Sequence, residues 1–161
     1  MRWIWIDKFV EFESGVRAAA IKNVSLAEDH LHDHFPAYPV MPASLMVEGM
    51  AQTAGILVGE ARQFREKVIL AKVKRARFDR EVRPGEQIRY EARVEQVSPE
   101  AASTVGRVLC DGNLIGEVDI VFSHIDNNLS GLQFPEENFV FTEEFKALLK
   151  TYNVSAAAPG K

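Results

Sequence analysis

The sequence predicts an α+β domain in which a long antiparallel sheet packs around one buried helix. Three observations point to this class. Residues 43–61 are apolar on nearly every side, which is typical of a helix buried in a core. Residues 87–97 alternate between apolar and mostly charged side chains, as a half-buried antiparallel strand does. Asp111-Gly112-Asn113 separates two further strand-like runs and is typical of a hairpin turn.

The segments before the buried helix are short. Residues 3–7 and 16–22 are predicted as strands joined through Glu13-Ser14-Gly15, a turn sequence. Residues 23–42 contain three prolines, which block helix formation and remove backbone donors, so this segment is predicted to be mostly irregular. Pro42 suits the first turn of the following helix, where a missing N–H group costs nothing.

Further strands are predicted after the helix. Besides residues 87–97, strand patterns occupy 68–78, 104–110 and 114–123.

The C-terminal part is predicted to be separate from the sheet. Residues 125–140 read as an extended linker, and 142–151 as a short amphipathic helix with Thr142 as its N-cap. The chain is therefore divided into a domain over residues 1–124 and an extension over 125–161 that ends in a frayed tail.

Length and composition restrict the class of protein. The chain has 161 residues, 47% hydrophobic and 26% charged, which fits one soluble globular domain. A net charge of −4 argues against a nucleic-acid-binding protein. Cys110 is the single cysteine, so an intrachain disulfide is excluded. With no signal peptide and no run long enough to insert into a membrane, a cytoplasmic location is expected.

Two residues have the properties of a general base and a general acid. His34 lies on the proline-rich loop His34-Phe35-Pro36-Ala37-Tyr38-Pro39, and histidine titrates near neutral pH. Glu48 follows fourteen positions later inside the apolar helix, where burial would favour the protonated carboxylic acid. One short segment could therefore remove a proton and protonate a leaving group.

The motifs around this pair resemble a known family. They are Asp7-Lys8-Phe9-Val10, Ala20-Ile21-Lys22-Asn23-Val24, the His34 loop with the Glu48 helix, Ala76-Arg77-Phe78, Val82-Arg83-Pro84-Gly85-Glu86-Gln87 and Asp111-Gly112. Over about residues 4–124 the chain resembles the 3-hydroxyacyl-[acyl-carrier-protein] dehydratases. That resemblance implies the hot-dog fold, an antiparallel sheet wrapped around one long helix.

The resemblance also implies a role for each site residue. His34 would take the C2 proton of a 3-hydroxyacyl thioester, and Glu48 would protonate the departing 3-hydroxyl group. The backbone N–H of Ala43, at a helix N-terminus, would polarise the thioester carbonyl. The Val40 carbonyl would orient the histidine ring, and Gln52, one turn after Glu48, would hold its carboxyl group. Because it has a glutamate at the acid position, the chain is similar to the branch of the family that dehydrates without isomerising the double bond.

The same resemblance implies partners and cofactors. The substrate would be carried on the phosphopantetheine of an acyl-carrier protein, and no metal or organic cofactor would be needed. The histidine and the carboxylate would come from different subunits of a dimer, alone or within a trimer of dimers. The chain departs from the family at Ala37 and Ala43, where glycine is usual.

Two clusters, one of lysines and arginines and one of histidines, have alternative interpretations. Lys72, Lys74, Arg75 and Arg77, followed by Arg80 and Arg83, form a basic run that is either a solvated strand face or a dock for the acidic carrier protein. His30, His32 and His34 would share one side of a strand and could hold a metal, although exposed loop histidines are the favoured interpretation.

Two other functions fit the same fold. A hot-dog thioesterase would use a carboxylate to activate water and could dispense with His34. A non-catalytic subunit that binds the acyl-carrier protein would account for Ala37, Ala43 and the C-terminal extension.

Overall fold

The computed structural model describes residues 3–125 and 140–156. Within these residues the chain forms six strands and three helices. In chain order they are β1 (Lys8–Glu13), β2 (Arg17–Asn23), α1 (Asp29–Asp33), α2 (Ala43–Ala61), β3 (Val68–Phe78), β4 (Gln87–Val97), β5 (Ala101–Cys110), β6 (Asn113–His124) and α3 (Glu143–Ala156).

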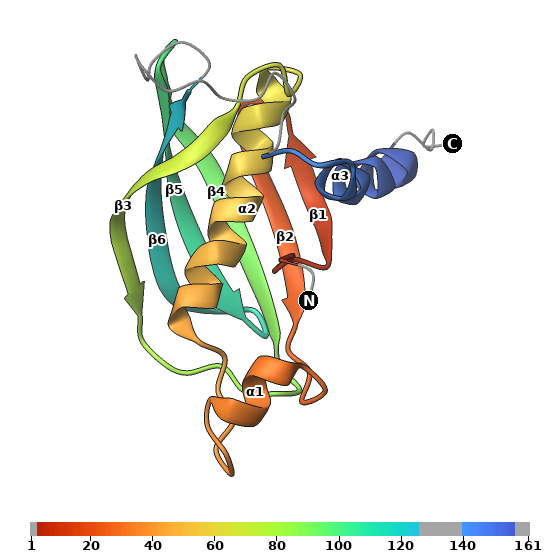
Figure 1. The fold of residues 1–161 in the computed structure, drawn as a ribbon, viewed down its shortest axis with the longest axis vertical. Helices are drawn as coiled ribbons and strands as arrows, with labels where there is room; N and C mark the ends of the chain where they lie inside the picture. Colours follow the sequence, from red (N-terminus) through yellow and green to blue (C-terminus); the bar gives the residue numbers. More distant parts are fainter. Residues whose placement is uncertain (1–2, 126–139, 157–161) are drawn as a thin grey trace.

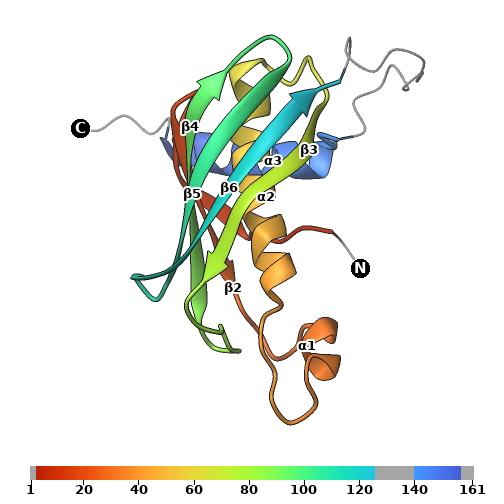
Figure 2. The same cartoon turned by 90° about the vertical axis from the view of Figure 1, so that its left-hand side faces the viewer.

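The six strands form one antiparallel sheet in the order β1-β2-β4-β5-β6-β3. The sheet curves around α2, which runs across its concave face (Figures 1 and 2). This arrangement confirms the predicted sheet and its one long buried helix. Within the described residues β1 and β3 are the outer strands, so the free edge of each pairs with no other strand.

Helix α2 forms the centre of the core, as its apolar sequence predicts. Every residue from 49 to 59 is buried. Two glycines let the helix lie close to the sheet: a Cβ atom at Gly49 would come within 2.5 Å of the Tyr90 ring, and one at Gly106 within 2.6 Å of Met50 Sδ. Because cores are close-packed, a side chain at either position would push helix and sheet apart.

The N-terminal strand prediction is wrong. Residues 3–6 have no regular secondary structure, residue 7 lies in a bend, and β1 begins only at Lys8. The backbone N–H of Trp5 donates to the side-chain oxygen of Gln52 at 2.7 Å instead of to a neighbouring strand. The buried side chains of Trp5 and Ile6 pack into the core, which explains why this segment has a strand-like composition.

One additional helix and two element boundaries differ from the prediction. The short helix α1 lies inside the segment predicted to be irregular, where its buried Leu31 anchors it ahead of the first of the three prolines. Strand β5 begins at Ala101 rather than at 104, and α3 ends at Ala156 rather than at 151.

The C-terminal helix lies against β1 (Figure 1). The Phe145 N–H donates to Thr142 Oγ1 at 3.5 Å, which confirms the predicted N-cap. Phe141 and Leu149 are buried and belong to the main core. The helix therefore packs onto the domain, while the rest of the predicted linker, 126–139, and the end of the tail, 157–161, lie outside the described residues. None of the helices in the described ranges is long and apolar enough to cross a membrane.

Candidate active site

His34 lies at the C-terminal end of α1, and backbone groups on both sides hold it in place. Its N–H donates to the His30 carbonyl at 3.2 Å. Its ring Nδ1 lies 2.9 Å from the Val40 carbonyl oxygen, and the Val40 N–H donates back to the His34 carbonyl at 3.0 Å. The Phe35 ring stacks on the imidazole with centroids 4.3 Å apart. The half-buried ring therefore has a fixed orientation.

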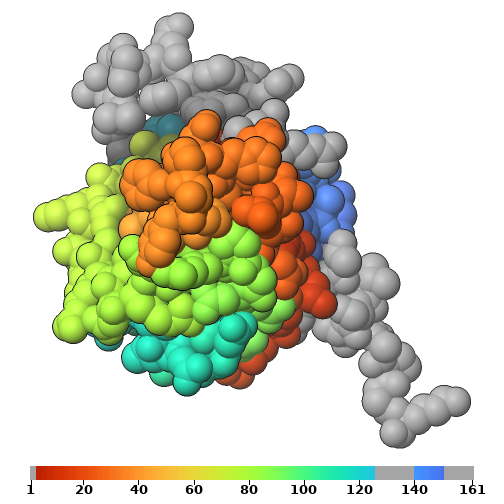
Figure 3. Space-filling view, turned by 90° about the horizontal axis from the view of Figure 1, so that it is seen from below, coloured from red at the N-terminus to blue at the C-terminus, as the bar shows by residue number. Residues whose placement is uncertain are grey.

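The loop after His34 rests on the connection between β3 and β4 (Figure 3). The Met41 N–H donates to the Val82 carbonyl at 2.8 Å. The Tyr38 hydroxyl donates to Glu81 at 3.0 Å, and the Arg83 guanidinium lies over the Tyr38 ring, 4.2 Å from its centroid. Ala37 has φ of 65°, a left-handed conformation that glycine adopts with less strain.

Burial lowers the pKa of the His30 imidazole, which lies beside the Trp5 ring. The lowered pKa follows from desolvation of the charged form, with Lys22 and His34 contributing in the same direction. At neutral pH the ring one helical turn before His34 is therefore uncharged.

Glu48 lies in the second turn of α2 and is half-buried rather than enclosed. Its Oε1 accepts hydrogen bonds from Gln52 Nε2 at 2.9 Å and from Trp3 Nε1 at 3.1 Å. Gln52 also donates to the Trp3 carbonyl at 3.1 Å and accepts from the Trp5 N–H at 2.7 Å. The N-terminal segment therefore completes the surroundings of Glu48. The sequence offered no signal for the contacts that Trp3 and Trp5 make with Glu48 and Gln52, because these join residues more than 40 positions apart.

We expect Gln52→Leu to lower the free energy of unfolding by about 1–3 kcal/mol, because it leaves the buried Trp5 N–H without an acceptor. Urea denaturation measures the difference. Gln96→Leu is the matched control, since Gln96 is an exposed glutamine on β4. Equal free energies of unfolding for the two variants would show that Gln52 does not stabilise the packing of the N-terminal segment.

His34 and Glu48 do not meet within one chain. Among the described residues His34 contacts Val40 and Phe35, whereas Glu48 contacts Gln52 and Trp3, and no hydrogen bond joins the two. His34 follows the end of α1, which lies below α2, whereas Glu48 lies on α2 itself (Figure 1).

An apolar groove of about 290 Å³ begins beside Glu48. On α2 its lining residues lie three and four positions apart and so form one stripe, which consists of Glu48, Ala51, Gln52, Gly55 and Ile56. The start of β3 and Phe122 of β6 form the other wall. Glu48 and Gln52 are its polar lining residues on α2, and Glu48 lies toward the N-terminal end of the helix.

The N-terminus of α2 offers backbone donors next to the His34 loop. The first helical bonds are the N–H groups of Leu45 and Met46 to the Pro42 carbonyl, at 3.0 and 3.2 Å. In the described part of the chain the N–H groups of Ala43 and Ser44 have no acceptor, and both residues are exposed. These groups and the helix dipole favour a negatively charged or carbonyl oxygen.

Comparison with known proteins decides the family. The model of the FabA-like domain matches residues 3–123. The chain belongs to the FabA-like family. It is 36% identical over 125 residues to the 3-hydroxyacyl-[acyl-carrier-protein] dehydratase FabZ of Thermomicrobium roseum, covering 77% of this chain and 84% of that one. It is 34% identical to the Listeria welshimeri FabZ, covering 77% and 87%.

Solved structures confirm the hot-dog fold that the resemblance implied. The dehydratase heterocomplex ApeI:P from Xenorhabdus doucetiae matches with a TM-score of 0.65 at 15% identity, covering 78% of this chain and 85% of that chain. A conserved protein from Pseudomonas aeruginosa matches with a TM-score of 0.60 at 18% identity, covering 73% and 87%. The FabA-like match ends at residue 123, so α3 lies beyond it.

The basic run of this FabA-like chain lies on the outer strand β3, and carboxylates neutralise much of it. Lys74 lies 3.7 Å from Glu95. Arg75 contacts Glu117 and Asp119, and Arg77 contacts Asp79. Lys72 is exposed and makes no ion pair within the described residues. Sequence could not show this pairing, because three of the four carboxylates come from other strands: Glu95 from β4, and Glu117 and Asp119 from β6.

A larger hollow, of about 460 Å³, contains neither His34 nor Glu48. It lies over charged side chains of all six strands, which largely pair with one another, as in Arg17–Glu11 and Arg107–Glu91. The apolar groove is smaller, but it reaches the candidate acid.

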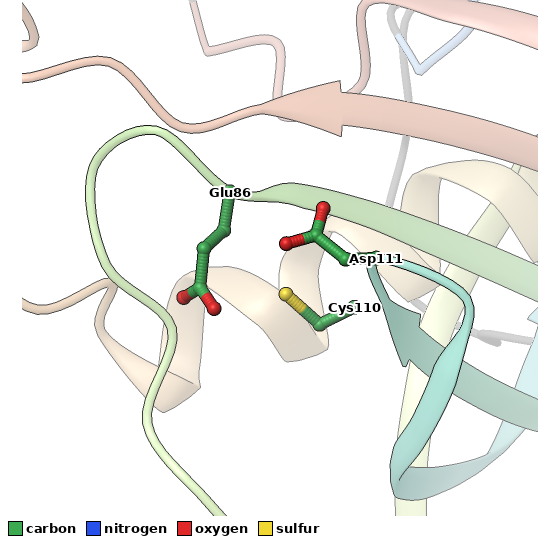
Figure 4. A group of neighbouring side chains, drawn as sticks. All are labelled: Glu86, Cys110 and Asp111. Atoms are coloured by element: carbon green, nitrogen blue, oxygen red, sulfur yellow. The ribbon is translucent and has the colours of Figure 1, made fainter.

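The three histidines do not form a metal site in the described residues. His30 and His32 lie on helix α1, not on a strand, so alternate residues do not share a face. The one group with suitable spacing in those residues is Glu86, Cys110 and Asp111 (Figure 4). Glu86 pairs with Arg80 at 2.9 Å, the Asp111 carboxylate accepts the Gln87 N–H at 3.1 Å, and burial raises the pKa of the Cys110 thiol. These contacts stabilise the turns and account for the grouping.

Proposed function

We propose that this FabA-like protein dehydrates 3-hydroxyacyl thioesters on an acyl-carrier protein to trans-2-enoyl thioesters, in cytoplasmic synthesis of fatty acids or related lipids and polyketides. The observation that carries the proposal is the position of Glu48, the carboxylate at the polar end of an apolar groove. FabZ dehydratases, at 34–36% identity, are the relatives that support it.

In this proposal His34 is the base. A carbonyl oxygen can only accept a hydrogen bond, so the contact with Val40 assigns the proton to Nδ1 and leaves the Nε2 lone pair for the substrate. Nε2 takes the C2 proton, and the C2–H electrons move toward the thioester carbonyl. The free N–H groups of Ala43 and Ser44 would stabilise the charge that develops on that oxygen.

Glu48 is the acid. Gln52 and Trp3 both donate to Oε1, which leaves Oε2 to face the substrate. The electrons held at the thioester then return to form the C2=C3 double bond as the C3–O bond breaks, and Glu48 gives its proton to the hydroxyl group, which departs as water. His34 has gained a proton and Glu48 has lost one, so proton exchange with solvent restores both groups. The chemistry needs no metal or organic cofactor, because the thioester already acidifies C2.

The site is proposed to form between two protomers, His34 of one working with Glu48 of the other. The two residues make no contact within one chain, and the outer edge of β3 is open. Exposed Leu70 and Val73 on that strand favour burial against a second copy. The assembly is a dimer or a trimer of dimers.

Proton NMR of the product tests the reaction. Incubation with a 3-hydroxyacyl-carrier thioester should give a trans-2 double bond in the intact thioester. A cis-3 product would contradict a non-isomerising enzyme. Release of a free thiol, retained in His34→Ala, would instead indicate a thioesterase.

Docking of the carrier protein is proposed on Lys72, Lys74, Arg75 and Arg77 of β3. We expect Lys72→Glu to weaken carrier binding by roughly two- to fivefold, the effect of one exposed ion pair. Calorimetric titrations at low and high salt measure the change, which should shrink at high salt. Lys8→Glu on β1 is the matched control, since Lys8 is also an exposed strand residue without an ion pair among the described residues. Binding that is insensitive to salt and to Lys72→Glu would rule out this surface.

A further inference from the structure

The end of the apolar groove opposite Glu48 is built by residues outside the FabA-like match. Val140, Phe141 and Phe145 line it there, whereas the family match ends at residue 123. The chain thus brings a segment distant in sequence to the same groove as the candidate acid. Neither the family match nor the sequence patterns assign this segment a role.

Phe141 is held firmly at this end. Its side chain is 4% exposed, and the Phe64 ring lies 5.0 Å from it. Gly59 on α2 makes room for it, because a Cβ atom there would come within 2.4 Å of the Phe141 ring. The ring therefore fills a space that any other residue at position 59 would occupy.

We propose that Phe141 is the end wall of the acyl-binding groove and sets the longest acyl chain that the enzyme accepts. This inference rests on the proposed function. Along the helix axis Gly55 lies about 10 Å, and Gly59 about 16 Å, beyond Glu48, at 1.5 Å per residue. The groove is thus a bounded site, with the polar reaction centre at one end and an aromatic ring at the other.

The shape and chemistry of the groove fit one extended alkyl chain. Beyond Gln52 its lining is apolar, so a ligand there gains by burying hydrocarbon and finds no polar partners. Gly55 leaves the helix side of the groove without a side chain, and its nearest neighbour across the groove is the Phe122 ring. An alkyl chain attached to a thioester held near Glu48 would run along this stripe toward Phe141.

Two opposite variants test the end wall. Phe141→Ala should extend the chain-length optimum, because the vacated volume admits further methylene groups. Gly55→Ala should shorten it: the added methyl would lie 3.5 Å from Phe122, an ordinary contact that the fold tolerates, and would occupy the groove. Leu149→Ala is the control, since Leu149 is equally buried but does not line the groove.

The readout is binding of saturated acyl-pantetheine probes with four to sixteen carbons, measured by calorimetry. This measurement does not require dehydration, so it separates the end wall from the reaction. Each newly buried methylene should tighten binding by roughly fourfold, equivalent to about 0.8 kcal/mol. In wild type the gain should stop at a definite length, which moves up in Phe141→Ala and down in Gly55→Ala.

Chain-length limits that coincide in wild type and both groove variants would overturn the inference, as would a limit that shifts equally in Leu149→Ala. Should Phe141→Ala fail to fold, Phe141→Leu, a smaller change at the same position, still tests the end wall through a smaller upward shift of the limit. Shifted binding limits without turnover of any 3-hydroxyacyl substrate would support the end wall and contradict the proposed reaction.

Discussion

Glu48→Gln should lower kcat for dehydration by roughly 10²–10⁴-fold without unfolding the protein. Glutamine keeps the size of the side chain and an oxygen that accepts from Gln52 and Trp3, but it has no acidic proton for the departing hydroxyl. His34→Ala should have an effect of similar size, because it removes the base. Steady-state kinetics with a 3-hydroxyacyl-carrier thioester provide the measurement.

Matched controls separate catalysis from structure. Glu60→Gln makes the same change on the same helix, away from the groove. His32→Ala removes an exposed histidine two positions before His34. Both controls should retain most of the wild-type rate. Wild-type turnover in both Glu48→Gln and His34→Ala would remove the acid–base pair from the mechanism.

Mixing the two inactive variants should restore activity, and this is the second large effect. If each site combines His34 of one protomer with Glu48 of its partner, a heterodimer of His34→Ala and Glu48→Gln has one intact site and one doubly altered site. Random pairing then yields about a quarter of the wild-type rate from subunits that are inactive alone. Co-expression with two affinity tags isolates the heterodimer.

The rate of the double variant completes this test. A chain that carries both substitutions, paired with wild type, should form no intact site, because one site then lacks His34 and the other lacks Glu48. An isolated heterodimer of the single variants that stays inactive would show that His34 and Glu48 belong to the same protomer's site, and the proposed dimer arrangement would fail.

The core of the fold could be predicted from sequence because its signals are local. An apolar helix at 43–61, alternation at 87–97 and a hairpin at Asp111-Gly112-Asn113 each follow from the periodicity of neighbouring residues. The irregular course of residues 3–6 could not be predicted. It depends on Gln52, which satisfies the Trp5 N–H from 47 positions away.

The sequence suggested candidate site residues but not their surroundings. The catalytic pairing of His34 with Glu48 stays a prediction, whereas the predicted contacts of His34 with Val40 and of Glu48 with Gln52 are present. The Trp3 contact, the pairing of the basic run with carboxylates and the Phe141 end of the groove depend on tertiary packing, which short-range patterns do not encode.

Mass spectrometry of a 3-hydroxyacyl-carrier thioester after incubation with the purified protein tests the central claim most directly. We predict that the wild-type chain removes one water from the acyl group, and that His34→Ala and Glu48→Gln leave the substrate intact. No loss of water across several chain lengths, from a folded protein that still binds the carrier, would contradict the proposed dehydratase and favour a non-catalytic carrier-binding subunit.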